Sequence, residues 1–74
     1  MADALHPDPG TAVVIDAVHR SGRSHAWVAR RIGISEGTMH RKMTCKSPIA
    51  VVEAMRMMRA LGTTFVAELR RARV

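Results

Sequence analysis

Two groups of side chains in this 74-residue chain are of types that can catalyse reactions or bind ligands: its histidines with a single cysteine, and a concentration of basic residues. His40 and Cys45 are the residue types that nucleophilic catalysis pairs, but no third group orients them and no oxyanion donors are evident. A zinc site needs four ligands, commonly in closely spaced pairs, and His19, His25, His40 and Cys45 lack that spacing. No glycine-rich phosphate loop is present. We therefore expect no enzyme, no metal site and no cofactor.

The basic residues are concentrated in the middle of the chain. The formal net charge is +6, and residues 20–46 hold seven Lys or Arg against Glu36 alone. A localised basic surface favours a polyanion, nucleic acid ahead of an anionic membrane, with solubility as the plain alternative. There is no run of 18 apolar residues and no signal-peptide pattern, so we expect no membrane contact. A single cysteine, Cys45, cannot form an internal disulfide, which favours a cytoplasmic location; a nucleic-acid partner would make it nucleoid-associated.

Apolar spacing predicts five helices and no strand, which makes the expected fold class all-α. Residues 1–10 contain two prolines and no apolar period, so they predict a flexible N-terminal arm before a domain at 11–74. Four of the predicted helices cover residues 9–20, 25–32, 48–61 and 65–73. The third helix follows Ser35 and ends before a polar break at 44–47.

Cap residues set these boundaries. Ser24, Ser35 and Ser47 are the expected N-caps of the second, third and fourth helices, and Asp8 is the expected N-cap of the first. Pro48 suits the first position of the fourth helix. Gly33 ends the second helix by adopting the left-handed conformation.

The predicted helix at 48–61 is more apolar than one buried face requires, because its charged residues form a single narrow stripe. It is either the central helix of a small bundle or part of a subunit interface. The candidates for a dimer interface are Met58, Leu61, Phe65 and Leu69.

The segment HAWVARRIGISEGTMHRKMT, residues 25–44, predicts two short helices joined by a turn at Gly33. It resembles the helix-turn-helix of the phage Cro/repressor family, the lambda-repressor-like domain. The resemblance rests on Ala29 four residues before Gly33, on Ile32-Gly33-Ile34-Ser35 and on Thr38-Met39, and it extends over about residues 11–72. It implies a five-helix bundle. The chain departs from the family pattern at Lys42, usually apolar, at Gly37 inside the helix, and at Glu36, often an amide.

If the third helix enters a major groove, its outward residues read base edges. Arg41 is the best candidate, because a guanidinium bonds guanine O6 and N7 together. The expected base-reading residues are Ser35, Glu36, Gly37, Thr38, His40 and Arg41. The expected phosphate contacts flank them and are Arg23, Ser24, His25, Lys42, Thr44 and Lys46.

The expected function is a sequence-specific regulator of transcription that binds double-stranded DNA, a Cro-like repressor of a phage or prophage acting at an operator. A homodimer would read two half-sites about 34 Å apart, and a monomer that pairs only on DNA fits the sequence equally well. An antitoxin-type protein-interaction module with the same fold and a non-specific architectural DNA-binding protein are the alternatives. No small-molecule ligand is expected.

Overall fold

The computed structural model describes residues 9–72, and this part of the chain folds into five helices without a strand. The helices are α1 (Pro9–Ser21), α2 (His25–Ile32), α3 (Glu36–Met43), α4 (Val51–Ala60) and α5 (Phe65–Ala72). The all-α prediction is confirmed. Within residues 9–72, no helix combines the length and apolar composition needed to cross a membrane.

The first helix starts where it was predicted to start. Pro9 and Gly10 belong to α1, which therefore overlaps the last two residues of the expected arm. Proline suits the first turn of a helix because its missing N–H would have no partner there. The rest of the expected arm, including the expected cap Asp8, lies outside the described residues, as does the last residue of the predicted helix 65–73.

The predicted caps of α2 and α3 are confirmed. Ser24 Oγ accepts a hydrogen bond from the backbone N–H of Trp27 at 3.0 Å, and Ser35 Oγ accepts from that of Thr38 at 3.1 Å. Gly33 has a φ of +81°, and its N–H donates to the carbonyl of Ala29 at 2.9 Å. A left-handed residue reverses the chain and satisfies the last carbonyls of α2, so α3 begins three residues later at an angle to α2.

The fourth helix starts later than predicted. It begins at Val51 with Ala50 as N-cap, so Ser47 is not its cap and Pro48 is not its first residue. Ala50 has no side-chain acceptor, and Glu53 takes part of the capping role by accepting from the Ala50 N–H at 2.9 Å.

Two hydrogen bonds to α3 explain the later start. The N–H of Ser47 donates to the carbonyl of Arg41 at 3.2 Å, and the carbonyl of Pro48 accepts from Lys42 Nζ at 2.9 Å. These contacts hold residues 47 and 48 in the connection, and the helix forms only where the chain reaches the α4 layer.

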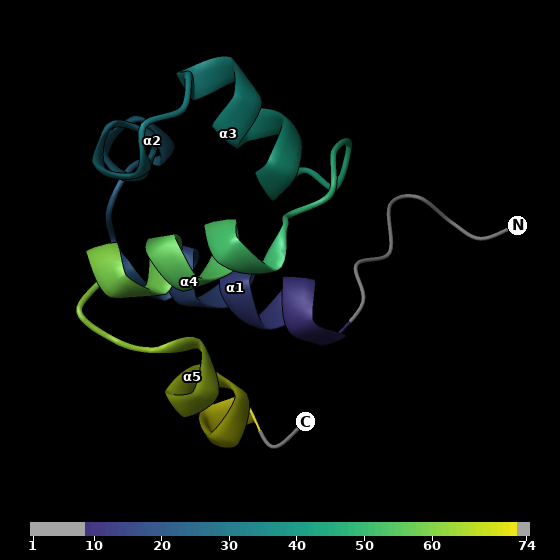
Figure 1. Ribbon diagram of the computed structural model, residues 1–74, viewed down its shortest axis with the longest axis vertical. Coiled ribbons are helices and arrows are strands. Elements are labelled where there is room, and N and C mark those ends of the chain that lie inside the picture. Colours follow the sequence, from purple (N-terminus) through teal and green to yellow (C-terminus); the bar gives the residue numbers. More distant parts are fainter. Residues whose placement is uncertain (1–8, 73–74) are drawn as a thin grey trace, which may run out of the picture.

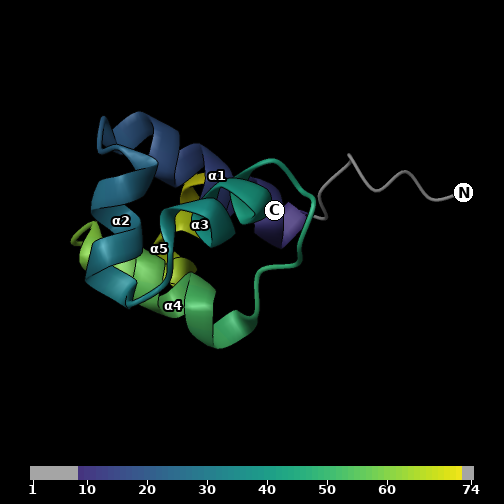
Figure 2. The same cartoon turned by 90° about the horizontal axis from the view of Figure 1, so that it is seen from above.

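The core lies between α4 and the other helices. In Figure 1, α4 and α1 form the middle of the molecule, with α2 and α3 at one end and α5 at the other; Figure 2 gives the view onto α3. The six largest side chains that are less than 2% exposed come from four helices: Val14, Val18, Val28, Met39, Met57 and Met58. The unbranched methionines fill the irregular space where three helices meet.

One ion-pair network holds α5 against α1. Arg20 Nε donates to Asp16 Oδ2 at 2.6 Å, and Arg20 Nη2 donates to Glu68 Oε1 at 2.6 Å. Glu68 also accepts from the hydroxyl of Thr63 at 2.8 Å. These bonds lower the pKa of Glu68, with the Arg20 guanidinium as the largest cause. Both carboxylates are therefore neutralised far from α3.

Candidate nucleic-acid interface

The helix α3 has one buried and one exposed face, as the sequence predicted. Met39 and Met43 are in the core. The residues expected to read bases are on the outer side: Ser35, Glu36, Gly37, His40 and Arg41 are exposed, and Thr38 is half-buried. Because α3 lies at one end of the molecule, its outer face is not covered by another helix (Figures 1 and 2).

The side chain of Arg41 turns back toward the start of α3. Its Nη2 donates to Thr38 Oγ1 at 3.3 Å, and the same oxygen accepts from the hydroxyl of Ser35 at 2.9 Å. A Cβ on Gly37 would meet only the Nη1 of Arg41, at 3.9 Å. The guanidinium is therefore carried over the first turn of α3, beside a position with no side chain. Packing within the described protein does not require glycine there.

Lys42, which was expected to contact phosphate, is bound within the protein in this structure. Its Nζ is 2.9 Å from Glu53 Oε1 and donates to the Pro48 carbonyl at 2.9 Å, and its side chain is 11% exposed. The hydrogen bond from Lys42 is the largest cause that lowers the pKa of Glu53, followed by the N–H of Ala50. Lys42 can occupy this largely covered position because Glu53 neutralises its charge and its stem is apolar.

Thr44 also serves the protein's own backbone. Its hydroxyl donates to the carbonyl of His40 at 2.9 Å, which occupies its single donor at the end of α3. In this structure the hydroxyl, which was expected to contact phosphate, instead helps to end α3. Cys45 follows with a φ of +65°, and Lys46 is exposed while its N–H donates to the Arg41 carbonyl at 2.8 Å. Three expected phosphate contacts follow Arg41 in the sequence: Lys42, Thr44 and Lys46. Among them, only the side chain of Lys46 is not bound to another group of the described protein.

Two guanidinium groups sandwich the ring of Trp27. Arg23 lies 4.5 Å from the ring centroid and Arg31 lies 4.4 Å from it. Cation–π contact of this kind places the two positive charges on one side of α2. Arg23 was among the predicted phosphate contacts and Arg31 was not. Trp27 and Arg31 are four residues apart and share one face of α2, which was the available signal for Arg31; Arg23 precedes the N-cap Ser24.

Three histidines from three helices meet beside α3. The ring centroids of His19 and His25 are 5.9 Å apart with an interplanar angle of 15°, and those of His25 and His40 are 6.2 Å apart. Burial lowers the pKa of His25, repulsion from His19 and then His40 lowers it further, and Glu36 opposes the change. His25 and His40 were among the predicted DNA contacts and His19 was not, because no local spacing connects it with them.

The expected dimer interface was partly wrong. Met58 is fully buried in the core and cannot contact a second subunit, while Leu61 and Phe65 pack partly against that core. The large apolar side chains that are exposed lie elsewhere on α4 and α5: Val51 (68%), Val52 (57%), Met55 (56%) and Val66 (56%). They line a groove of about 580 Å³ that Arg56 and Arg59 border.

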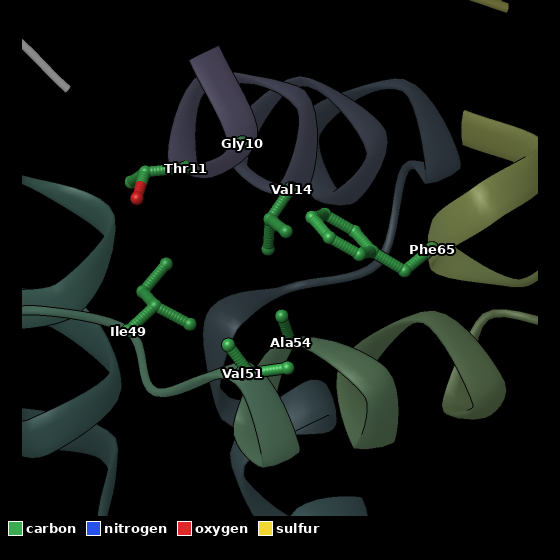
Figure 3. Close-up of a pocket in the computed structure, with 7 residues that line it drawn as sticks. All are labelled: Gly10, Thr11, Val14, Ile49, Val51, Ala54 and Phe65. Carbon is green, nitrogen blue, oxygen red and sulfur yellow. The ribbon is translucent and has the colours of Figure 1, made fainter. Parts of the chain in front are cut away.

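A smaller cavity of about 190 Å³ lies between α1, the connection to α4, and α5 (Figure 3). The ring of Phe65 points from α5 toward Val14 of α1, with Ile49 and Ala54 on the opposite wall (Figure 3). None of its seven lining residues is charged. Its lining presents no group for acid–base chemistry.

Comparison of the chain with models of protein families, with curated proteins and with solved structures finds no match. The candidate interface therefore stands on its geometry and charge: an uncovered polar face of α3, with Arg41 over its first turn and with Arg23, Lys46 and three histidines around it.

Proposed function

We propose that this chain is a sequence-specific double-stranded DNA-binding protein of the phage Cro/repressor kind. In this proposal α2, the turn at Gly33 and α3 form a helix-turn-helix, and α3 enters the major groove. The observation that carries it is the division of α3 into a face in the core and a face that no helix covers. The core contact fixes the orientation of the helix, so its polar side chains are presented before DNA arrives.

The distribution of charge supports this assignment. Among the described acidic residues, Asp16, Glu53 and Glu68 are in ion pairs, which leaves Glu36 as the acid on the outer face of α3. Arg41, Arg23 and Lys46 remain exposed around that face. The face therefore carries a net positive charge, as contact with phosphates on both sides of a groove requires.

The proposed biological role is that of a transcriptional regulator, a Cro-like repressor that blocks RNA polymerase at an operator. Two copies on a near-palindromic operator would supply the contacts that one short helix lacks. We propose that they pair through the exposed apolar residues Val51, Val52 and Met55 of α4 and Val66 of α5.

A selection from random duplexes with the purified protein tests the proposal directly. We expect one enriched motif, and its symmetry and half-site spacing report the number of copies bound. Enrichment without a motif would support an architectural protein instead, and no enrichment at low salt would refute DNA binding.

The variant Arg41→Ala then tests how bases are read. A bidentate contact to guanine is worth about 1–3 kcal/mol, so we expect a loss of about 5- to 150-fold on the selected site and a smaller loss on random DNA. Arg70→Ala is the matched control, because it removes the same charge from α5 at the opposite end of the molecule (Figure 1). Equal losses on both DNAs would reassign Arg41 to phosphate contact.

The exposed apolar groove favours a second candidate function, an antitoxin-type module that holds a protein partner. Four large apolar side chains at more than half exposure are unusual on a domain of this size, and such patches mark interaction surfaces. Sedimentation of the purified chain with and without duplex separates the two readings. A dimer, either free or bound to DNA, supports the regulator. A monomer in both states supports the antitoxin-type module, with the groove binding a different protein.

A further inference from the structure

We propose that the imidazoles of His19, His25 and His40 form one binding site for a backbone phosphate of duplex DNA, and that this site takes up protons as the duplex binds. The inference deepens the proposed function and rests on it. It adds His19 to the interface and moves His40 from base reading to phosphate contact.

The geometry brings the three rings together from three separate helices. His19 is in the last turn of α1, His25 is the first residue of α2, and His40 is in α3. The central ring, His25, is partly buried, whereas His19 and His40 are exposed. Centroid distances of 5.9 and 6.2 Å mean that one anionic group can lie within reach of more than one ring. A protonated imidazole donates from both nitrogens, which suits an oxygen-rich anion.

The charges around this histidine cluster oppose protonation in the free protein. His25 faces His19 of α1 on one side and His40 and Glu36 of α3 on the other. Among the described residues, α4 also packs against α2 and places no charged group that shifts His25. Burial and the two neighbouring histidines lower the pKa of His25, and the positive end of the α2 dipole acts in the same direction. Glu36 alone opposes them.

A phosphate reverses this balance. Its negative charge compensates the repulsion among the rings and interacts favourably with the N-terminus of α2. A nearby opposite charge favours the protonated form of histidine, so binding and proton uptake are linked. Each imidazole whose pKa rises by about one unit on binding makes the affinity up to about tenfold higher at low pH than at high pH. Histidine titrates near pH 6.5 and the pKa of His25 is lowered in the free protein, so binding should tighten as the pH falls from about 7 through that lowered pKa.

The test measures the dissociation constant of a fluorescently labelled duplex at pH 6, 7 and 8, at fixed ionic strength. We expect binding to the wild type to tighten several-fold from pH 8 to pH 6, and the variant H19Q/H25Q/H40Q to lose most of that change. Arg23→Gln is the control, because a guanidinium keeps its charge throughout this range. It should weaken binding by the same factor at every pH.

A direct readout of the central ring keeps the test independent of how the triple variant folds. ¹⁵N-detected titration of wild-type imidazoles should show His25 titrating at higher pH with duplex bound than without it. Duplex binding that is equally tight at pH 6 and pH 8, with no shift of His25, would overturn the phosphate site and leave the proposed function intact. Absence of binding to any duplex at every pH would overturn both.

Discussion

Lys42 and Lys46 are close in sequence, but the structure gives them different roles, and the substitutions Lys42→Met and Lys46→Met test that difference. Lys42 Nζ contacts the Glu53 carboxylate and the Pro48 carbonyl, each at 2.9 Å, and joins α3 to the start of α4. Methionine keeps the apolar stem and removes the charge. A hydrogen bond to a charged group contributes about 1.5–3 kcal/mol. Water offsets part of that loss because the Glu53 side chain is 26% exposed, so we expect a loss of about 1–2 kcal/mol.

Two measurements separate the roles. A domain of this size loses about 4–8 °C in Tm per kcal/mol, so Lys42→Met should melt about 4–16 °C lower by circular dichroism, while Lys46→Met should melt like the wild type. The dependence of duplex affinity on salt should behave in the opposite way. Loss of one phosphate contact flattens the log–log slope by about 0.9, which we expect for Lys46→Met and not for Lys42→Met. A wild-type melt for Lys42→Met together with a flatter slope would show that the ion pair with Glu53 is not what positions this lysine.

The other predictions concern the turn, the reading helix, acid pH and the apolar groove. Gly33→Val should lower the free energy of unfolding, measured by chemical denaturation, by at least about 1–2 kcal/mol. The φ of Gly33 is +81° and the space around it is open, so backbone strain is the whole effect. Gly33→Asn is the control and should lose less, because asparagine tolerates positive φ better than valine. Gly37→Ala should stabilise α3 by up to about 1 kcal/mol yet weaken operator binding, and unchanged binding would show that DNA does not approach this position closely. The pKa of Glu53 is lowered in the folded state, so the stability that its charge contributes is present above about pH 4.5 and is lost as the pH falls through the lowered pKa. The difference in Tm between the wild type and Lys42→Met should therefore become smaller below pH 4.5. A difference that stays constant would contradict the ion pair. Val52→Lys should leave the Tm unchanged but raise the concentration at which the protein sediments as a dimer, and an unaffected dimer would place the interface elsewhere.

The two short helices around Gly33 were predictable because their signals are local. Ser24 and Ser35 cap the next turn through hydrogen bonds that span three residues, and glycine is the residue that adopts a positive φ without strain. Met39 and Met43, four residues apart, follow the period of a helix and identify its buried face. The exposed residues of α3 then follow from the same period.

The fourth helix was harder to predict because its residues are apolar on nearly every side. Its sequence cannot say which part of the apolar surface meets α1 and α2, so Met58 was assigned to the surface, although Val52 and Met55 are the exposed residues. The cap signal was also misleading. Ser47 and Pro48 form a good helix start in isolation, but hydrogen bonds to α3 hold both in the connection.

The sequence by itself determined the all-α class, the two capped helices with their glycine turn, and the polar face of α3, because each depends on residues within about one helical turn of one another. The tertiary structure alone decided which cations stay free and which groups meet. It paired Lys42 with Glu53 across two helices and brought His19, His25 and His40 together from three. Such contacts depend on how helices pack, and helix packing is set by the shapes of many side chains at once rather than by the spacing along any one segment.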